Sequence, residues 1–151
     1  MKLHFGKSLL FAVLALLCSS ATGLAQAGGT CKLVIHVDGF HSDKGKLGAT
    51  IFNSPDGWPE KTEKAFRHGP FPITGNTGVA TFDLPAGDYG VAVIADANEN
   101  KKLDRNFLSI PTEGFGFANN PKVSLSAPPY SAAVDHVACP VTETTVHLIY
   151  K

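Results

Sequence analysis

The chain has 151 residues, of which 44% are hydrophobic and 17% are charged, and its formal net charge at pH 7 is zero. After residue 27 it carries eleven Lys and Arg against thirteen Asp and Glu, which is a net charge of −2 with histidine neutral. This balance excludes a protein that attracts nucleic acid or anionic lipid surfaces through its net charge alone.

The first 27 residues have the three parts of a secretory signal peptide. Lys2 and Lys7 give a positive start, Leu9–Cys18 is an apolar run of ten residues, and residues 25–27 (Ala-Gln-Ala) offer small side chains to a signal peptidase. A membrane-spanning helix needs roughly 20 residues, so no membrane span is expected after cleavage. We therefore predict that residues 28–151 form one exported domain, periplasmic or secreted.

Two cysteines, Cys31 and Cys139, remain after cleavage. An even number of cysteines in an oxidising compartment favours a disulfide, and two separate free thiols are the alternative. The bridge would bring the two ends of the domain together. It would close a loop of more than a hundred residues, for which loop-closure entropy predicts a stabilisation on the order of 4–5 kcal/mol.

Alternating apolar and polar side chains, separated by turn residues, predict about seven short strands. They are expected over Lys32–Asp38, Leu47–Phe52, Phe71–Thr74, Val79–Leu84, Tyr89–Ala95, Ser131–Val137 and Thr144–Tyr150. Residues 59–66 fit either a short helix that begins at Pro59 or an irregular edge segment. The pattern favours an all-β fold, an antiparallel β-sandwich of immunoglobulin or transthyretin type with one long ordered loop.

That loop runs from Asp96 to Pro129 and is too long for an idle connection. Its first part (DANENKKLD, 96–104) carries oxygen-bearing side chains at alternate positions, a spacing that presents several oxygens to one centre. Calcium takes six to eight oxygen ligands from such loops. The predicted calcium ligands are Asp96, Asn98, Asn100, the backbone carbonyl of Lys102, and Asp104, with Glu113, Asn106 or water completing the site.

Two positions in this loop leave an alternative open. Lys101 stands where a calcium-binding loop normally has the glycine of its sharp turn, and Phe107 stands where a complete EF-hand has a bidentate glutamate. A complete EF-hand is therefore excluded. The alternative to an incomplete calcium site is an Asx-rich turn that hydrogen-bonds its own backbone and binds nothing.

Three phenylalanines, Phe107, Phe115 and Phe117, follow in a glycine-rich stretch where no strand is expected. Either they fold back to cap the core of the sandwich, or they form an exposed aromatic platform. Capping is favoured because exposed aromatic surface is costly unless it is used. The candidate surface for a partner consists of Phe115, Phe117, Asn119 and Asn120.

The run from Tyr89 to Asn120 resembles the DUF2141 family of uncharacterised bacterial exported proteins. The residues that match are Asp96, Asn98, Asn100, Lys102, Leu103, Asp104, Asn106, Ile110, Pro111, Glu113, Gly114, Phe115, Gly116, Phe117, Asn119 and Asn120. The resemblance implies a bacterial source and a sandwich fold, and it implies no particular activity. The chain departs from the family at Ala95, Lys101, Ser109 and Ala118, in place of histidine, glycine, glycine and serine. The absent glycine counts against a metal site, and the absent histidine removes a candidate functional side chain.

No nucleophile elbow, zinc-protease helix, phosphate-binding loop or dinucleotide fingerprint is present in the sequence. We therefore expect a binding or scaffold module of the cell envelope, with calcium as its cofactor and an unknown protein or small ligand as its partner, and not an enzyme. One alternative is a purely structural periplasmic protein without metal. Another is a small hydrolase that uses the carboxylates of Asp104 and Glu113.

Overall fold

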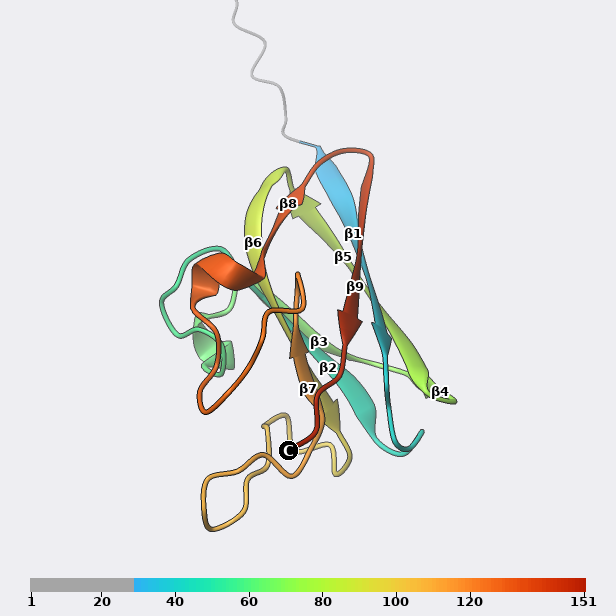
Figure 1. Cartoon of the computed structure of the whole chain (residues 1–151). Coiled ribbons are helices and arrows are strands. Elements are labelled where there is room, and N and C mark those ends of the chain that lie inside the picture. The colour runs from blue at the N-terminus through green and yellow to red at the C-terminus, as the bar shows by residue number, and fades with distance from the viewer. Residues whose placement is uncertain (1–28) are drawn as a thin grey trace, which may run out of the picture.

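The computed structural model describes residues 29–151, which form two β-sheets packed face to face (Figure 1). The predicted signal peptide, residues 1–27, lies outside the described residues. The strands are β1 (Thr30–Asp38), β2 (Lys46–Phe52), β3 (Arg67–Phe71), β4 (Ile73–Thr74), β5 (Thr77–Pro85), β6 (Gly87–Asp96), β7 (Phe115–Phe117), β8 (Val134–Val137) and β9 (Val141–His147). Two single 3-10 turns, η1 (Thr62–Lys64) and η2 (Tyr130–Ala133), complete the elements. The prediction of an all-β sandwich is confirmed.

The strand order is β4-β5-β1-β9 in one sheet and β3-β2-β6-β7 in the other. In the second sheet, β8 pairs with residues 87–90 of β6, while β7 pairs with residues 92–94 of the same strand. The pairs are antiparallel except β1 and β9, the first and last strands, which run parallel. The first and last strands therefore lie side by side, but the prediction that the two ends of the domain come together is wrong: because the strands run parallel, the start of β1 and the C-terminal end lie at opposite ends of the sheet (Figure 1).

The core between the sheets follows from the period of two in the sequence. β1 and β5 bury every second side chain. Leu33 and Ile35 of β1 therefore lie on the same face of the sheet as Ala80 and Leu84 of β5. The opposite sheet contributes inward side chains such as Val91 of β6. Each such aliphatic side chain stabilises the fold by roughly 1.5–3 kcal/mol when it is fully buried.

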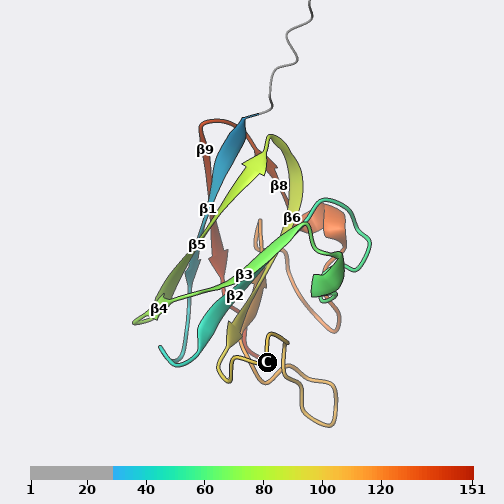
Figure 2. The ribbon, with the colours of Figure 1, turned by 180° about the vertical axis from the view of Figure 1, so that it is seen from behind.

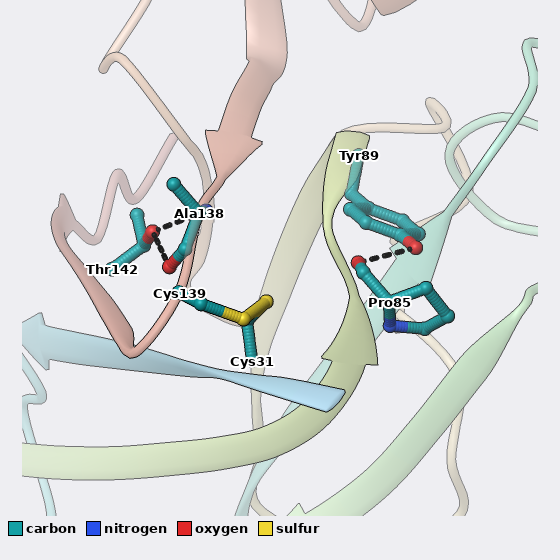
Figure 3. The surroundings of a disulfide bond; sticks show 6 residues. All are labelled: Cys31, Pro85, Tyr89, Ala138, Cys139 and Thr142. Atoms are coloured by element: carbon teal, nitrogen blue, oxygen red, sulfur yellow. Dashed lines mark hydrogen bonds between the residues drawn. A yellow bond between two sulfur atoms is a disulfide. The ribbon is translucent and has the colours of Figure 1, made fainter. Parts of the chain in front are cut away.

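The predicted disulfide joins Cys31 in β1 to Cys139 just before β9, with the Cα atoms 4.6 Å apart and a sequence separation of 108 (Figure 3). The turn that carries Cys139 is closed by Thr142. Its hydroxyl accepts a hydrogen bond from the Ala138 N–H (2.9 Å) and donates one to the Ala138 carbonyl (3.2 Å). The bridge is thus placed where β9 begins to pair with β1.

Several predicted element boundaries differ from the structure. The edge segment before β3 is irregular, with only the turn η1 in place of a helix. The predicted strand at 131–137 begins as η2, because the extended Pro129 leads directly into a 3-10 turn. The last strand starts at Val141, three residues earlier than predicted, and ends at His147. The prediction of no strand around the phenylalanines was wrong, since β7 pairs there with β6.

A second apolar cluster lies on the outer face of the β3-β2-β6-β7 sheet. Along β6, Val91 and Val93 face the inter-sheet core, whereas Ala92 between them packs with Phe115 and Phe117 of β7. Both views of the ribbon place the η1 segment, the loop after β6 and the η2 segment together on one side of the molecule (Figures 1 and 2). These segments surround the outer face of this sheet. Among the described residues, no helix is long and apolar enough to span a membrane.

Candidate functional site

The loop after β6 is anchored by Asp96, the last residue of that strand, whose side chain is buried. Its carboxylate accepts backbone N–H groups of the loop at both oxygens. Oδ1 receives the N–H of Asn100 at 3.0 Å, and Oδ2 receives the N–H of Lys101 at 2.7 Å. Lys101 has a φ of 64°, the left-handed conformation that a calcium loop normally assigns to glycine.

Asn98, Asn100 and Asp104 form a second set of contacts in the same loop. The amide groups of Asn98 and Asn100 donate to the two oxygens of the Asp104 carboxylate, at 2.6 and 2.8 Å. The side-chain oxygen of Asn98 accepts the N–H of Asn100, and that of Asn100 accepts the N–H of Lys102. The loop therefore satisfies its own polar groups, as expected of an Asx-rich turn.

Glu113 joins the two ends of this loop. Its side chain is 8% exposed, and its two oxygens accept the N–H groups of Ala97 (2.9 Å) and Asp104 (3.0 Å). A buried carboxylate with two backbone donors is well satisfied without a counter-ion. Glu113 is therefore a clamp that fixes the loop against the end of β6.

The structure brings the predicted calcium ligands together in one loop, and the ligand side chains all have oxygens that accept N–H donors: Asp96, Asn98, Asn100, Asp104 and Glu113. Within residues 29–151, no three His, Cys, Asp or Glu side chains come close enough to hold a metal ion. To bind at Asp104, calcium would have to replace the amide N–H groups of Asn98 and Asn100 there. Calcium binding stays a prediction.

The tip of the long loop presents apolar side chains to solvent. Asn106 holds it, since its side-chain oxygen accepts the N–H groups of Leu108 (2.9 Å) and Ile110 (3.1 Å). Phe107 is 93% exposed and Leu108 is 63% exposed. Of the three phenylalanines, Phe107 is therefore the one that does not cover an apolar cluster.

Phe115 and Phe117 are both 5% exposed and pack in the outer cluster, so the favoured capping interpretation holds for these two. Their cluster is not the inter-sheet core, because their side chains lie on the outer face of β6. Gly116 between them faces inward. A Cβ there would meet a methyl group of Val146 at 2.6 Å, so only glycine fits.

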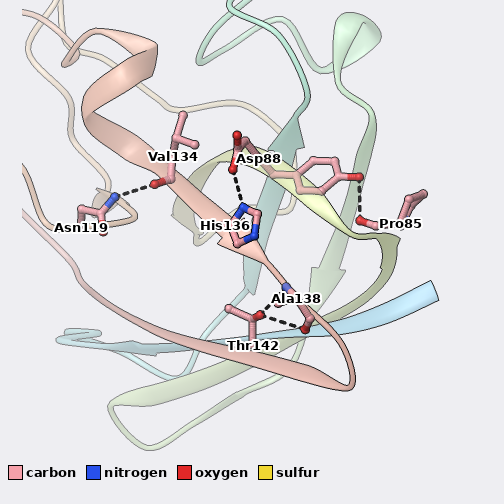
Figure 4. A network of polar contacts seen from close by, with 8 residues as sticks. Pro85, Asp88, Asn119, Val134, His136, Ala138 and Thr142 are labelled. Carbon is pink, nitrogen blue, oxygen red and sulfur yellow. Dashed lines mark hydrogen bonds and ion pairs between the residues drawn. The ribbon is translucent and has the colours of Figure 1, made fainter. Parts of the chain in front are cut away.

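Asn119 and Asn120 use their amides to hold neighbouring strands. The Asn119 amide donates to the carbonyl of Val134 at 2.8 Å (Figure 4). The Asn120 side chain donates to the carbonyl of Thr145 and accepts the N–H of His147, both at 2.8 Å. The two residues lock the segment after β7 onto β8 and β9, and their role in binding a partner stays a prediction.

A groove of about 630 Å³ lies on the outer face of the β3-β2-β6-β7 sheet. Three outward side chains of the central strands are small, Gly48 and Thr50 on β2 and Ala92 on β6, and they form the hollow part of the floor, while Ile94 of β6 lies over Gly48. Larger side chains of the outer cluster, Phe115 and Phe117, border this floor on one side.

The walls of the groove come from the loops on either side. One wall is the part of the long loop from Leu103 to Pro111, and the other is the segment from Val123 to Ala127. Arg105 forms an ion pair with Glu60, which joins the long loop to the segment before η1. The Glu113 clamp and this ion pair together position the loop as a wall.

The groove was not predicted from the sequence, although the sequence carries a signal for it. The run from Val91 to Ala95 is apolar at both strand parities, which is typical of a strand covered on both faces. An antiparallel sheet with one solvated face would instead alternate apolar and polar residues. The outer face of β6 was therefore predictable as a covered surface, but the segments that cover it were not.

A half-buried carboxyl, that of Asp135 in β8, lies away from the groove. Burial raises the pKa of Asp135, and a hydrogen bond with Thr144 of β9 opposes this effect. Its Oδ2 atom is buried and has no hydrogen-bond partner among residues 29–151. Asp135 lies where β8 approaches β9 and does not line the groove.

Comparison with known proteins gives one match. The model of a family described as an uncharacterized protein conserved in bacteria (DUF2141) matches residues 35–145. The chain belongs to the DUF2141 family. The match includes β2 and β6 of the groove floor and the whole loop from Asp96 to Glu113, so the predicted resemblance is confirmed. Searches of curated proteins and of solved structures found no match.

Proposed function

We propose that this DUF2141 protein is an exported binding module, periplasmic or secreted, that holds a small, mostly apolar ligand in the outer groove. The groove is the observation that supports this proposal. Its volume of about 630 Å³ lies within the roughly 300–1,000 Å³ of small-molecule sites, which are mostly apolar concavities.

Exposed apolar side chains around the groove support the same conclusion. Leu108, Ile110 and Leu125 line it, and they are 63%, 39% and 103% exposed. Soluble monomers rarely leave contiguous apolar surface open unless it binds something. These side chains would cover the ligand from both walls.

The proposal is for binding and not for hydrolysis. The alternative hydrolase would use Glu113 and Asp104 as its pair of carboxylates. Both oxygens of Glu113 accept backbone N–H groups, and both oxygens of Asp104 accept asparagine amides. These hydrogen bonds fix the conformation of the loop, which supports a structural role for Glu113 and Asp104.

Filling the groove tests the proposed function. Thr50→Phe places a large side chain on the groove floor, and we expect it to weaken the binding of N-phenyl-1-naphthylamine, an uncharged apolar fluorophore, by at least tenfold. The matched control is Thr81→Phe, which makes the same change at an exposed position on β5 of the opposite sheet. Fluorescence titration at equal protein concentration measures both. Equal binding by the two variants, or no saturable binding by the parent protein, would contradict the proposal.

A second proposal is that calcium supports the loop that forms one wall of the groove. Lys101 already has the left-handed conformation of the glycine in a calcium loop, and Asp104 already contacts both Asn98 and Asn100. Rotation of the two amides would turn their oxygens toward the centre that Asp104 faces. Calcium would then add to the rigidity of a wall that the Glu113 clamp and the Arg105–Glu60 ion pair already position.

Thermal unfolding with calcium and with a chelator checks the calcium proposal. A ligand that binds only the folded state raises the free energy of unfolding by about 2.7 kcal/mol at a hundredfold excess over its dissociation constant. We expect millimolar calcium to raise the Tm by several degrees in the parent protein and not in Asp104→Ala. If calcium does not shift the Tm of the parent protein, the calcium proposal is contradicted and the loop is a self-capped turn.

A further inference from the structure

The charges around the groove differ in sign from those of the rest of the protein. Four cationic side chains line it, Lys46, Lys101, Arg105 and Lys151, against two carboxylates, Glu60 and Asp96, which gives the lining a net charge of +2 with His68 neutral. The chain after residue 27 carries −2, so the remaining surface carries −4. A cleft with one dominant charge and apolar walls concentrates its field on whatever enters it.

Two of these cations are free to meet a ligand. Arg105 is paired with Glu60, and the Lys151 ammonium donates to the Val123 carbonyl at 2.9 Å. In the described part of the chain, the ammonium groups of Lys46 and Lys101 make no ion pair and no hydrogen bond. They are the amines that remain available to an anion.

Lys46 and Lys101 lie at the same end of the groove. Lys46 is the register partner of Asp96 across the β2–β6 pair, and the Lys101 N–H donates to the Asp96 carboxylate. The Asp96 carboxylate, which is 4% exposed and accepts a backbone N–H at each oxygen, offsets one of the two lysine charges. This end of the groove therefore keeps a net charge of +1, and its floor continues from there past Ile94 and Gly48 to Ala92 and Thr50.

We infer that the ligand of the groove is an anionic amphiphile, a long alkyl chain ending in a carboxylate. The carboxylate lies between Lys46 and Lys101, and the alkyl chain lies along the small-residue floor between Leu108 and Leu125. This inference rests on the proposed function, since it names the chemical class of the ligand for the same groove. A purely apolar ligand would leave the two amines without a partner, and a cationic one would be repelled by them.

Three probes with the same alkyl chain test this inference: laurate, 1-dodecanol and dodecyltrimethylammonium. Each is titrated below its aggregation threshold into the exported, oxidised protein. Trp58, the one tryptophan of the sequence, has its ring 5.6 Å from that of Phe117 at the border of the floor, so its fluorescence reports binding. We expect laurate to bind about tenfold more tightly than dodecanol, which corresponds to one hydrogen-bonded charge contact. Dodecyltrimethylammonium should bind more weakly than dodecanol.

The variants then assign the preference to the two lysines. The double variant Lys46→Gln, Lys101→Gln should lose the preference for laurate and keep the affinity for dodecanol. Lys44→Gln, which removes an exposed lysine outside the groove, should change neither. Retention of the preference in the double variant, or equal binding of laurate and dodecanol by the parent protein, would overturn the inference and leave the proposed function standing. Failure of all three probes to bind would instead contradict the proposed function.

Discussion

Loss of the disulfide between Cys31 and Cys139 is expected to lower the free energy of unfolding by about 3–5 kcal/mol. The bond joins two residues that are 108 positions apart in sequence, and loop-closure entropy in the unfolded chain grows with the length of the loop. The bond also holds β9 next to β1, and this parallel pair joins the first strand to the last. Urea denaturation with and without reductant measures the effect.

The control for this prediction separates the effect of the covalent cross-link from the effect of the buried side-chain volume of the cysteines. Cys31 is fully buried in the inter-sheet core, so Cys31→Ala, Cys139→Ala loses side-chain volume as well as the bond. Reduction of the parent protein keeps both sulfur atoms in place. Reductant should destabilise the parent protein and have no effect on the double variant. A reduced parent protein with unchanged stability would contradict the prediction.

Glu113→Ala is expected to lower the free energy of unfolding by about 2–4 kcal/mol. The change leaves the N–H groups of Ala97 and Asp104 without their acceptor, and hydrogen bonds to a charged group contribute about 1.5–3 kcal/mol each before the loop relaxes. The same change should weaken ligand binding, because the clamped loop is one wall of the groove. Urea denaturation and fluorophore titration measure the two effects.

A carboxylate in the same loop provides the matched control. Glu99 is exposed, and its side chain makes no hydrogen bond within residues 29–151. Glu99→Ala should therefore alter stability by no more than about 0.5 kcal/mol, as expected for a surface change. Equal losses in Glu99→Ala and Glu113→Ala would show that Glu113 is not a clamp.

Most of the fold was predictable because its strands bury one face. Strict alternation in residues 32–38 and 79–84 fixes both the strands and their inward side chains. β7 was not predictable, because the three residues Phe-Gly-Phe are too few to show a period, and Phe115–Phe117 becomes a strand only through pairing with β6. The parallel pairing of β1 with β9 is likewise a property of the assembled sheet and leaves no local signal in either segment.

The candidate site was predictable in part. The spacing of oxygen-bearing residues from Asp96 to Asp104 located the ordered loop. The hydrogen bonds from Ala97 and Asp104 to the Glu113 carboxylate make Glu113 part of the same loop. The hydrogen bonds that decide between calcium and self-capping depend on amide orientation, which spacing does not specify. The groove arises from small outward residues on β2 and β6 that are neighbours only after the strands pair.

The most direct test of the ligand groove is an NMR titration of the isotope-labelled, oxidised protein with N-phenyl-1-naphthylamine. If the groove holds the ligand, we expect saturable amide shifts at Gly48, Thr50, Ala92 and Ile94 and in the two walls, residues 103–111 and 123–127, with β1, β5 and β9 unchanged. Shifts confined to the β4-β5-β1-β9 sheet, or the absence of saturable shifts, would contradict a ligand site on this face.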